Sequence, residues 1–152
     1  MTDTGSNSIV KVETTRFGEV EVDQDRIVTL PQGMVGFPLQ TEYTFIQHRD
    51  GSPLHWLQST QRPNLAFVVV NPLIFDQEYQ VAIGSAETKL LQVEDPSQIQ
   101  VWVVVTIPPG HPEKMTANLR APVVINLATR LGAQVIMESS DMPLRKPLVN
   151  GQ

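Results

Sequence analysis

The chain has 152 residues, a size typical of one domain with its own hydrophobic core. Its 11 Lys and Arg against 16 Asp and Glu give a net charge of −5, which argues against a general nucleic-acid binder and suits a basic protein partner. The chain has no cysteine, no signal-peptide pattern at its start and no apolar run long enough for a membrane helix, so we expect a cytoplasmic protein without disulfides or thiolate metal sites.

The first half of the chain reads as short strands separated by turns. Residues 1–8 are small and polar, and we predict that they are disordered. Alternating apolar and polar residues then indicate half-buried strands, and the continuous apolar run before Asn71 and Pro72 indicates a central strand. The strands predicted here are residues 9–14, 18–22, 26–30, 43–47, 54–59 and 65–70.

Residues 31–38 cannot form regular structure, because two prolines remove backbone donors and two glycines favour positive φ. Met34 and Phe37 are unusually apolar for a solvated loop. We expect this loop to fold back over an open barrel end or to present Met34 and Phe37 to a partner.

The second half contains the best helix candidate, residues 85–92, with Ser85 as its N-cap. Strands are predicted at residues 99–107, 115–119, 123–126 and 133–137, with a kink at Ala121 and Pro122 and a turn at Gly132. Residues 139–152 hold prolines and scattered charge, and we predict a flexible tail.

About ten short strands and one short helix predict an all-β, mostly antiparallel fold: a small β-barrel-like single domain over residues 9–138. Trp56 and Trp102 lie within apolar strands and are expected in the core.

No catalytic spacing, nucleophile elbow or phosphate-binding glycine loop occurs in the sequence, so we predict a non-enzymatic protein without cofactor or metal. His48 and His55 flank a turn near Asp50, which is the only metal-like arrangement. One alternative is a small-molecule-binding or enzymatic barrel with a cavity near His48, His55 and Glu42. Another is an RNA-binding barrel, which the low aromatic content and the lack of a basic groove disfavour.

Six motifs follow one another in a characteristic order. They are Phe17-Gly18, Pro31-x-Gly33-x-x-Gly36-Phe37, Trp56-Leu57-Gln58-Ser59, Leu65-Ala66-Phe67-x-Val69-x-Asn71-Pro72, Val105-Thr106-Ile107-Pro108 and Pro112-Glu113-Lys114-Met115-Thr116-x-Asn118-Leu119-x-Ala121-Pro122-x-x-Ile125-Asn126. Together they resemble the flagellar assembly factor FliW family from Val10 to Met137. Leu30 stands where an aromatic residue is frequent, and Val35 where a proline is frequent.

The resemblance implies a non-catalytic protein, expected to be a monomer, that binds flagellin and alternatively the RNA-binding translational repressor CsrA. Export of flagellin would free the protein to capture CsrA and relieve repression of flagellin translation. In the family this antagonism is thought to be allosteric, although an acidic protein near the RNA site could also repel RNA directly.

For the partner surface we expect exposed apolar or charged residues on segments that do not resemble core. The candidates are Met34, Phe37, Phe75, Glu113, Lys114 and Met115.

Overall fold

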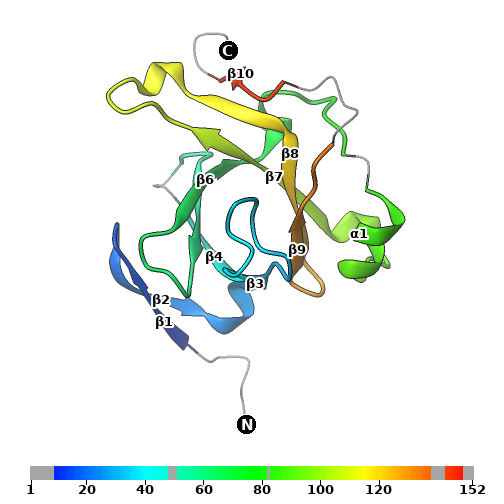
Figure 1. Ribbon diagram of the computed structural model, residues 1–152, viewed down its shortest axis with the longest axis horizontal. Coiled ribbons are helices and arrows are strands. Elements are labelled where there is room, and N and C mark those ends of the chain that lie inside the picture. The colour runs from blue at the N-terminus through cyan, green and yellow to red at the C-terminus, as the bar shows by residue number, and fades with distance from the viewer. Residues whose placement is uncertain (1–8, 48–50, 82, 138–142, 149–152) are drawn as a thin grey trace.

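Strands that follow one another around a closed ring form the centre of the molecule (Figure 1). The computed structural model describes residues 9–47, 51–81, 83–137 and 143–148. Within them, seven strands close in the order β8-β7-β6-β5-β4-β3-β9 and back to β8. All pairings are antiparallel except β3 with β9, so the predicted mostly antiparallel barrel with one short helix is confirmed.

The strands lie close to the predicted positions because β-branched and aromatic residues fill them. Their bounds are β1 Ile9–Thr14, β2 Gly18–Asp23, β3 Ile27–Thr29, β4 Glu42–Gln47, β5 His55–Ser59, β6 Ala66–Val70, β7 Ile99–Thr106, β8 Thr116–Asn126, β9 Leu131–Gln134 and β10 Lys146–Pro147. Short 3-10 turns lie at Gln24–Arg26, Pro72–Ile74, Pro96–Gln98 and Pro112–Lys114, labelled η2 to η5 in that order.

Strands β1 and β2 form a separate two-stranded ribbon against the outside of the barrel (Figure 1). Its turn is attached to β5 through Trp56, since the Arg16 guanidinium lies 4.4 Å from the Trp56 ring centroid and the Phe17 ring meets it edge-on. Trp56 is therefore half-buried beneath the ribbon turn, whereas Trp102 lies in the barrel core as predicted.

The loop between β3 and β4 lies in the middle of the ring and closes one end of the barrel (Figure 1). We call residues 31–38 the plug. Two tight turns shape it, because Gly33 N–H donates to Leu30 and Phe37 N–H donates to Met34. Both Gly33 and Gly36 have positive φ, as the glycine spacing predicted.

Three apolar clusters hold the described residues together: the barrel core, the arm cluster and a third cluster at the end of α1, with buried Leu91, Val124, Ala133 and Val135. The buried residues of the barrel core are Val28, Leu30, Met34, Tyr43, Leu57, Leu65, Val69, Trp102, Val123 and Ile125. The buried residues of the arm cluster are Val70, Tyr79, Val103, Val105, Ala117 and Leu119.

A sharp bend divides β8 into two parts (Figure 1). Trp102 pairs with Val123 but Val104 pairs with Asn118, so residues 119–122 lie opposite Val103 alone. This bulge is the predicted kink, and it tolerates Pro122 because the ladder is already interrupted there. Beyond it, residues 104–118 extend as a hairpin that we call the arm.

The turn into β9 lies earlier than predicted, at residues 127–130, and Gly132 is inside the strand. A glycine is needed at this strand position because a Cβ on Gly132 would lie 2.5 Å from the Ile125 Cδ1 atom. The chain still follows β8 to Met137, whose N–H donates to Arg120 O.

The described part of the predicted flexible tail, residues 143–148, runs along the edge of the arm. Lys146 and Pro147 form β10 opposite Ala117 and Thr116, and Leu148 packs on the arm cluster. This pairing differs from the prediction for these residues, and it covers a strand edge that would otherwise leave backbone groups unpaired. Residues 1–8, 138–142 and 149–152 lie outside the described residues.

The one α-helix of the described residues, α1 at Ser85–Leu90, is shorter than predicted. Ser85 is its first residue and not its cap. Gly84 occupies the N-cap position, and its N–H donates to Glu87 Oε1 at 3.0 Å. In the part of the chain that the structure describes, no helix has the length and apolarity needed to cross a membrane.

Candidate functional site

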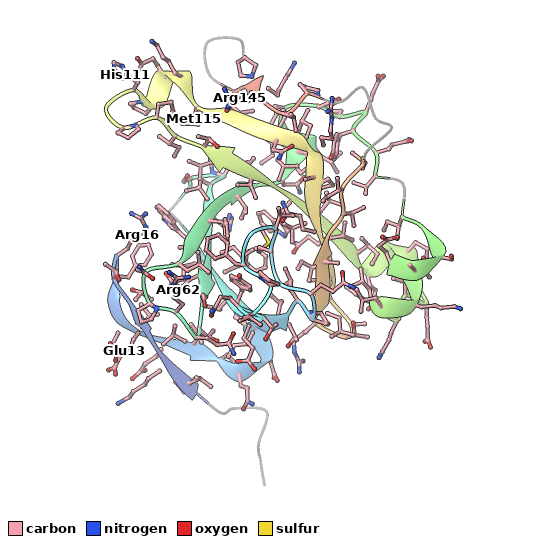
Figure 2. The ribbon with its side chains drawn as sticks, in the orientation of Figure 1. Glu13, Arg16, Arg62, His111, Met115 and Arg145 are labelled. Atoms are coloured by element: carbon pink, nitrogen blue, oxygen red, sulfur yellow. The ribbon has the colours of Figure 1, made fainter. Side chains whose placement is uncertain are left out.

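The tip of the arm carries two of the predicted partner residues. Glu113 and Lys114 lie in η5 and are exposed, and His111 Nδ1 lies 3.2 Å from Glu113 Oε2. Figure 2 shows His111 and Met115 on the arm, with Arg145 on the C-terminal segment beside it. Prolines at positions 108, 109 and 112 restrict this turn, so a partner would meet an ordered surface.

Met115 and Phe75 are both half-buried and pack against the arm cluster. Phe75 follows η3, where Leu73 and Ile74 are exposed. The structure therefore brings Phe75 and Met115 to one apolar cluster, with the charged tip of the arm next in sequence to Met115.

The other two candidates, Met34 and Phe37, belong to the plug and pack against the barrel core. Met34 is 2% exposed, so it fills the barrel end and is not available at the surface. Phe37 is half-buried, edge-on to Phe67 and beneath the Arg62 guanidinium. Of the two arrangements expected for this loop, the structure shows the one that closes the barrel.

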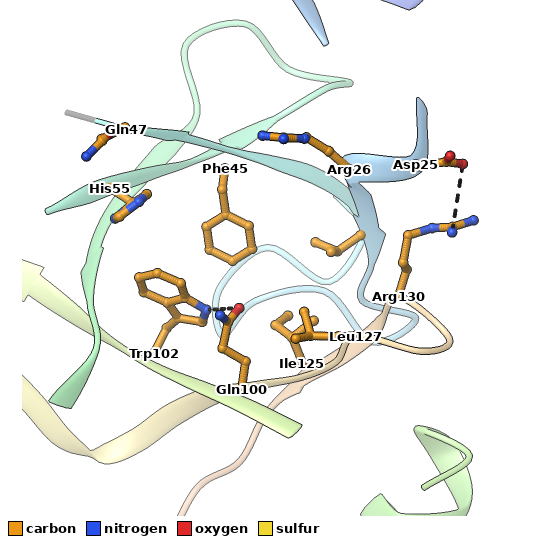
Figure 3. A pocket seen from close by; sticks show the side chains of 11 residues that line it. Asp25, Arg26, Phe45, Gln47, His55, Gln100, Trp102, Ile125, Leu127 and Arg130 are labelled. Carbon is orange, nitrogen blue, oxygen red and sulfur yellow. Dashed lines mark hydrogen bonds and ion pairs between the residues drawn. The ribbon is translucent and has the colours of Figure 1, made fainter. Parts of the chain in front are cut away.

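The opposite end of the barrel is open and contains a cavity of about 400 Å³ (Figure 3). Its floor consists of buried side chains from three strands, Val28, Trp102 and Ile125. Phe45 forms one wall, with its ring centroid 4.9 Å from that of Trp102, and His55 meets Trp102 edge-on at 5.0 Å.

The polar rim of the cavity is rich in hydrogen-bond donors. Arg26 comes from η2 and Arg130 from the turn between β8 and β9. Asp25 is the carboxylate of the rim, but its Oδ1 atom lies 4.0 Å from Arg130 Nη1 and both side chains are about half exposed. An exposed pair at this distance contributes little energy, so Arg130 remains available to a ligand.

Of the described residues named for the alternative small-molecule site, His55 lines the cavity and Glu42 does not. His55 lines the cavity, and its Nδ1 lies 3.3 Å from Pro53 O, while Glu42 lines a separate hollow of about 190 Å³. His48 and Asp50 lie outside the described residues. Among the residues that are described, no group of three His, Asp or Glu side chains could hold a metal ion.

The outer face of the β1–β2 ribbon is acidic. Glu13 lies directly opposite Glu19, and Lys11 lies opposite Glu21. A hydrogen bond with Glu13 raises the pKa of Glu19 above the ordinary carboxyl value, and desolvation and the neighbouring charges add to the effect. Like charges that face each other in this way suit a basic partner more than a neutral one.

Two features of these surfaces escaped the sequence reasoning. The first is the C-terminal strand along the arm, for which the single apolar Leu148 was the available signal. The second is most of the lining of the cavity, since the sequence reasoning placed a cavity near His48, His55 and Glu42 but did not include Phe45, Trp102 and Arg130. Phe45 and Trp102 could be recognised as strand aromatics, but which barrel end stays open depends on where the plug packs.

Comparison with known proteins gives a consistent result. The FliW protein family model matches residues 11–148. The flagellar assembly factor FliW of Thermosipho africanus is 36% identical over 134 residues, which cover 88% of this chain and 92% of the relative. That of Alkaliphilus metalliredigens is 41% identical over 129 residues, which cover 84% and 79%.

A crystal structure of the flagellar assembly factor FliW superposes with a TM-score of 0.84 at 28% identity, covering 92% of this chain and 97% of that one. The predicted resemblance is confirmed at the level of family, fold and lack of enzymatic function. This chain belongs to the FliW family of non-enzymatic flagellar assembly factors.

Proposed function

We propose that this protein is a cytoplasmic, monomeric regulator that binds flagellin and, when flagellin is scarce, binds a CsrA-type RNA-binding translational regulator instead. Capture of the regulator relieves repression of flagellin translation. The observation that carries the proposal is the family match over residues 11–148, which includes the barrel, the arm and the C-terminal strand.

Charge and surface support a protein partner. The net charge of −5 and the acidic ribbon face favour encounter with a basic RNA-binding protein. Since binding free energies are reciprocal, RNA and this protein weaken each other's binding to the regulator by the same factor.

The proposed contact surface is the arm, with Glu113 and Lys114 at its tip and Met115 and Phe75 on its apolar side. Met34 and Phe37 contribute indirectly by holding the barrel closed. Exposed charges beside half-buried apolar side chains are typical of a surface that takes an amphipathic helix.

The partner switch is tested by calorimetric titration with CsrA from the same organism, repeated after saturation with flagellin. We expect tight binding that flagellin abolishes. Binding to neither protein would show that the proposed partners are wrong for this member of the family.

The contact surface is tested by Lys114→Glu, with Lys89→Glu as the matched control, because both lysines are exposed and both changes alter the net charge equally. Lys89 lies on α1, away from the arm (Figure 1). We expect Lys114→Glu to lower the affinity for at least one partner by about 5-fold or more. Lys89→Glu should change the affinity for neither partner.

Equal affinities in both variants would place the surface elsewhere. Phe75→Ala examines the apolar side. Because Phe75 packs on the arm cluster, its result counts only if thermal unfolding shows an intact fold.

A further inference from the structure

We propose that the open barrel end is a binding site for a small aromatic anion, a flat apolar body that carries one carboxylate, sulfonate or phosphate group. The site is the cavity lined by Phe45, Trp102, Gln100, Arg26 and Arg130 (Figure 3). Its volume of about 400 Å³ is within the range of roughly 300–1,000 Å³ typical of small-molecule pockets.

The apolar part of the ligand is specified by the aromatic wall. The Phe45 and Trp102 rings are inclined by 31° with centroids 4.9 Å apart, and Leu127 is exposed at the rim. An exposed leucine at the rim and a half-buried Phe45 in the wall leave apolar surface in water, which a flat ligand would cover.

The anionic part follows from the hydrogen-bonding groups that face the cavity. Trp102 Nε1–H donates to Gln100 Oε1 at 2.9 Å. Because an indole N–H can only donate, the Gln100 oxygen must face Trp102, and its amide N–H₂ is left for a ligand. Arg26 forms no ion pair with any residue that the structure describes. Two arginines and the Gln100 amide, against the single carboxylate of Asp25 in the lining, therefore favour an anion.

The backbone of Arg130 is strained but fixed by two hydrogen bonds. Its φ of 61° is in the left-handed region, where a non-glycine side chain is strained. Its N–H donates to Asn126 O at 2.7 Å, and its carbonyl accepts from Thr29 N–H at 2.8 Å. Glycine would adopt this backbone without strain, and the arginine in its place supplies a guanidinium to the rim of the cavity.

The turn that carries Arg130 is also rigid. Buried Asn126 donates through Nδ2 to Leu91 O at 2.9 Å, and Thr129 Oγ1 donates to the same carbonyl at 3.1 Å. The end of α1 thus fixes the position of one rim of the cavity, so little ordering entropy is lost when a ligand binds.

The probe for this site is anilinonaphthalene sulfonate, compared with N-phenyl naphthylamine, which has the same rings without the charge. We expect saturable fluorescence with one site per chain, and shifts of the Trp102 indole and Gln100 amide signals in two-dimensional NMR spectra. The neutral probe should bind about 10-fold more weakly or worse.

Variants separate binding from folding. Arg130→Gly should keep or raise the melting temperature, since it relieves the strained backbone. It should also lower the affinity for the anionic probe by about 10-fold. The matched control is Gln92→Gly, because Gln92 has a similar φ of 56° but does not line the cavity. Arg26→Gln should also weaken binding, and Arg145→Gln, on the C-terminal segment, should not.

Four results with the probes alone would overturn the assignment: no saturable binding, NMR shifts away from the cavity, equal affinity for both probes, or affinity unchanged in Arg130→Gly and Arg26→Gln. Displacement of the probe by flagellin or CsrA would make the cavity part of the protein-binding surface and would also overturn it. The cavity and the arm are tested by different variants, so failure here leaves the partner switch untouched.

Discussion

At the scale of single residues, two buried threonines differ in whether their hydroxyl groups form hydrogen bonds. Thr14 Oγ1 donates to Gly18 O at 2.8 Å and accepts from Phe17 N–H at 2.8 Å, so its hydroxyl holds the ribbon turn. Thr44 is fully buried, and its Oγ1 atom has no hydrogen-bond partner among the described residues. Burying a hydroxyl without a partner opposes folding, whereas a bonded one is tolerated.

We therefore expect Thr44→Val to raise the free energy of unfolding by about 1 kcal/mol, because a methyl group replaces an unpaired hydroxyl. The matched change Thr14→Val should lower it by about 1–3 kcal/mol, because two backbone groups lose their partner. Urea unfolding of both variants measures the difference. A loss of stability in Thr44→Val would mean that its hydroxyl has a bonding partner in solution.

At the scale of elements, the plug decides the shape of the barrel. It turns back on itself, so that Met34 enters the barrel core and the opposite end stays open. The backbone of Gly33 lies so close to the next turn that a Cβ would meet Phe37 O at 2.3 Å, while a Cβ on Gly36 would meet nothing within 4 Å. Both glycines have positive φ.

This difference gives a matched pair of variants. Gly36→Ala should cost about 1–2 kcal/mol in the free energy of unfolding, because alanine is strained at positive φ. Gly33→Ala should cost about 1–3 kcal/mol more, because the plug must also move to admit the methyl group. Thermal and urea unfolding measure both variants. Equal losses would show that the plug adapts freely at Gly33.

At the scale of the whole molecule, the barrel core and the arm cluster each bury one of the two tyrosines of the chain. Burial raises the pKa of Tyr43 to about 12. Burial, with a smaller effect from the Asp76 charge, raises the pKa of Tyr79 to about 12, and its hydroxyl donates to Leu119 O at 2.5 Å. High pH therefore favours ionisation of a buried tyrosine in each of these two clusters.

The consequence is a stability that falls in alkali. Well below pH 10 both tyrosines are protonated in the folded and unfolded chains, so their contribution is constant. Between pH 10 and 12 the unfolded chain loses phenolic protons before the folded one, and the free energy of unfolding decreases. Ultraviolet absorbance of phenolate, followed with circular dichroism, should show ionisation only near pH 12 or together with unfolding.

Tyr43→Phe provides the control for this titration. Its hydroxyl has no partner among the described residues, but phenylalanine puts no methyl group in its place, so the change should not lower stability at pH 7 and should make the alkaline loss shallower. Phenolate formation near pH 10 in the folded protein would contradict the burial of both rings.

Most strands and the family follow from the sequence, because they depend on local patterns. Period-two alternation in β1 and β2, the β-branched run of β7 and the glycines of the plug each reflect a preference that a short segment carries by itself. The turn predicted at Gly132 was wrong because that glycine packs closely against Ile125 inside β9, and the cap predicted at Ser85 was wrong because Gly84 and Glu87 form the N-cap interaction instead.

The surfaces could be decided only by the tertiary structure. Met34 and Met115 look alike in the sequence, as methionines in segments rich in proline, yet the plug buries one in the barrel core and the arm leaves the other half exposed. The aromatic cavity joins side chains from β4, β5 and β7 with an arginine from the turn after β8. Such a site depends on how the ring closes, and closure is a property of long-range pairing that no local pattern contains.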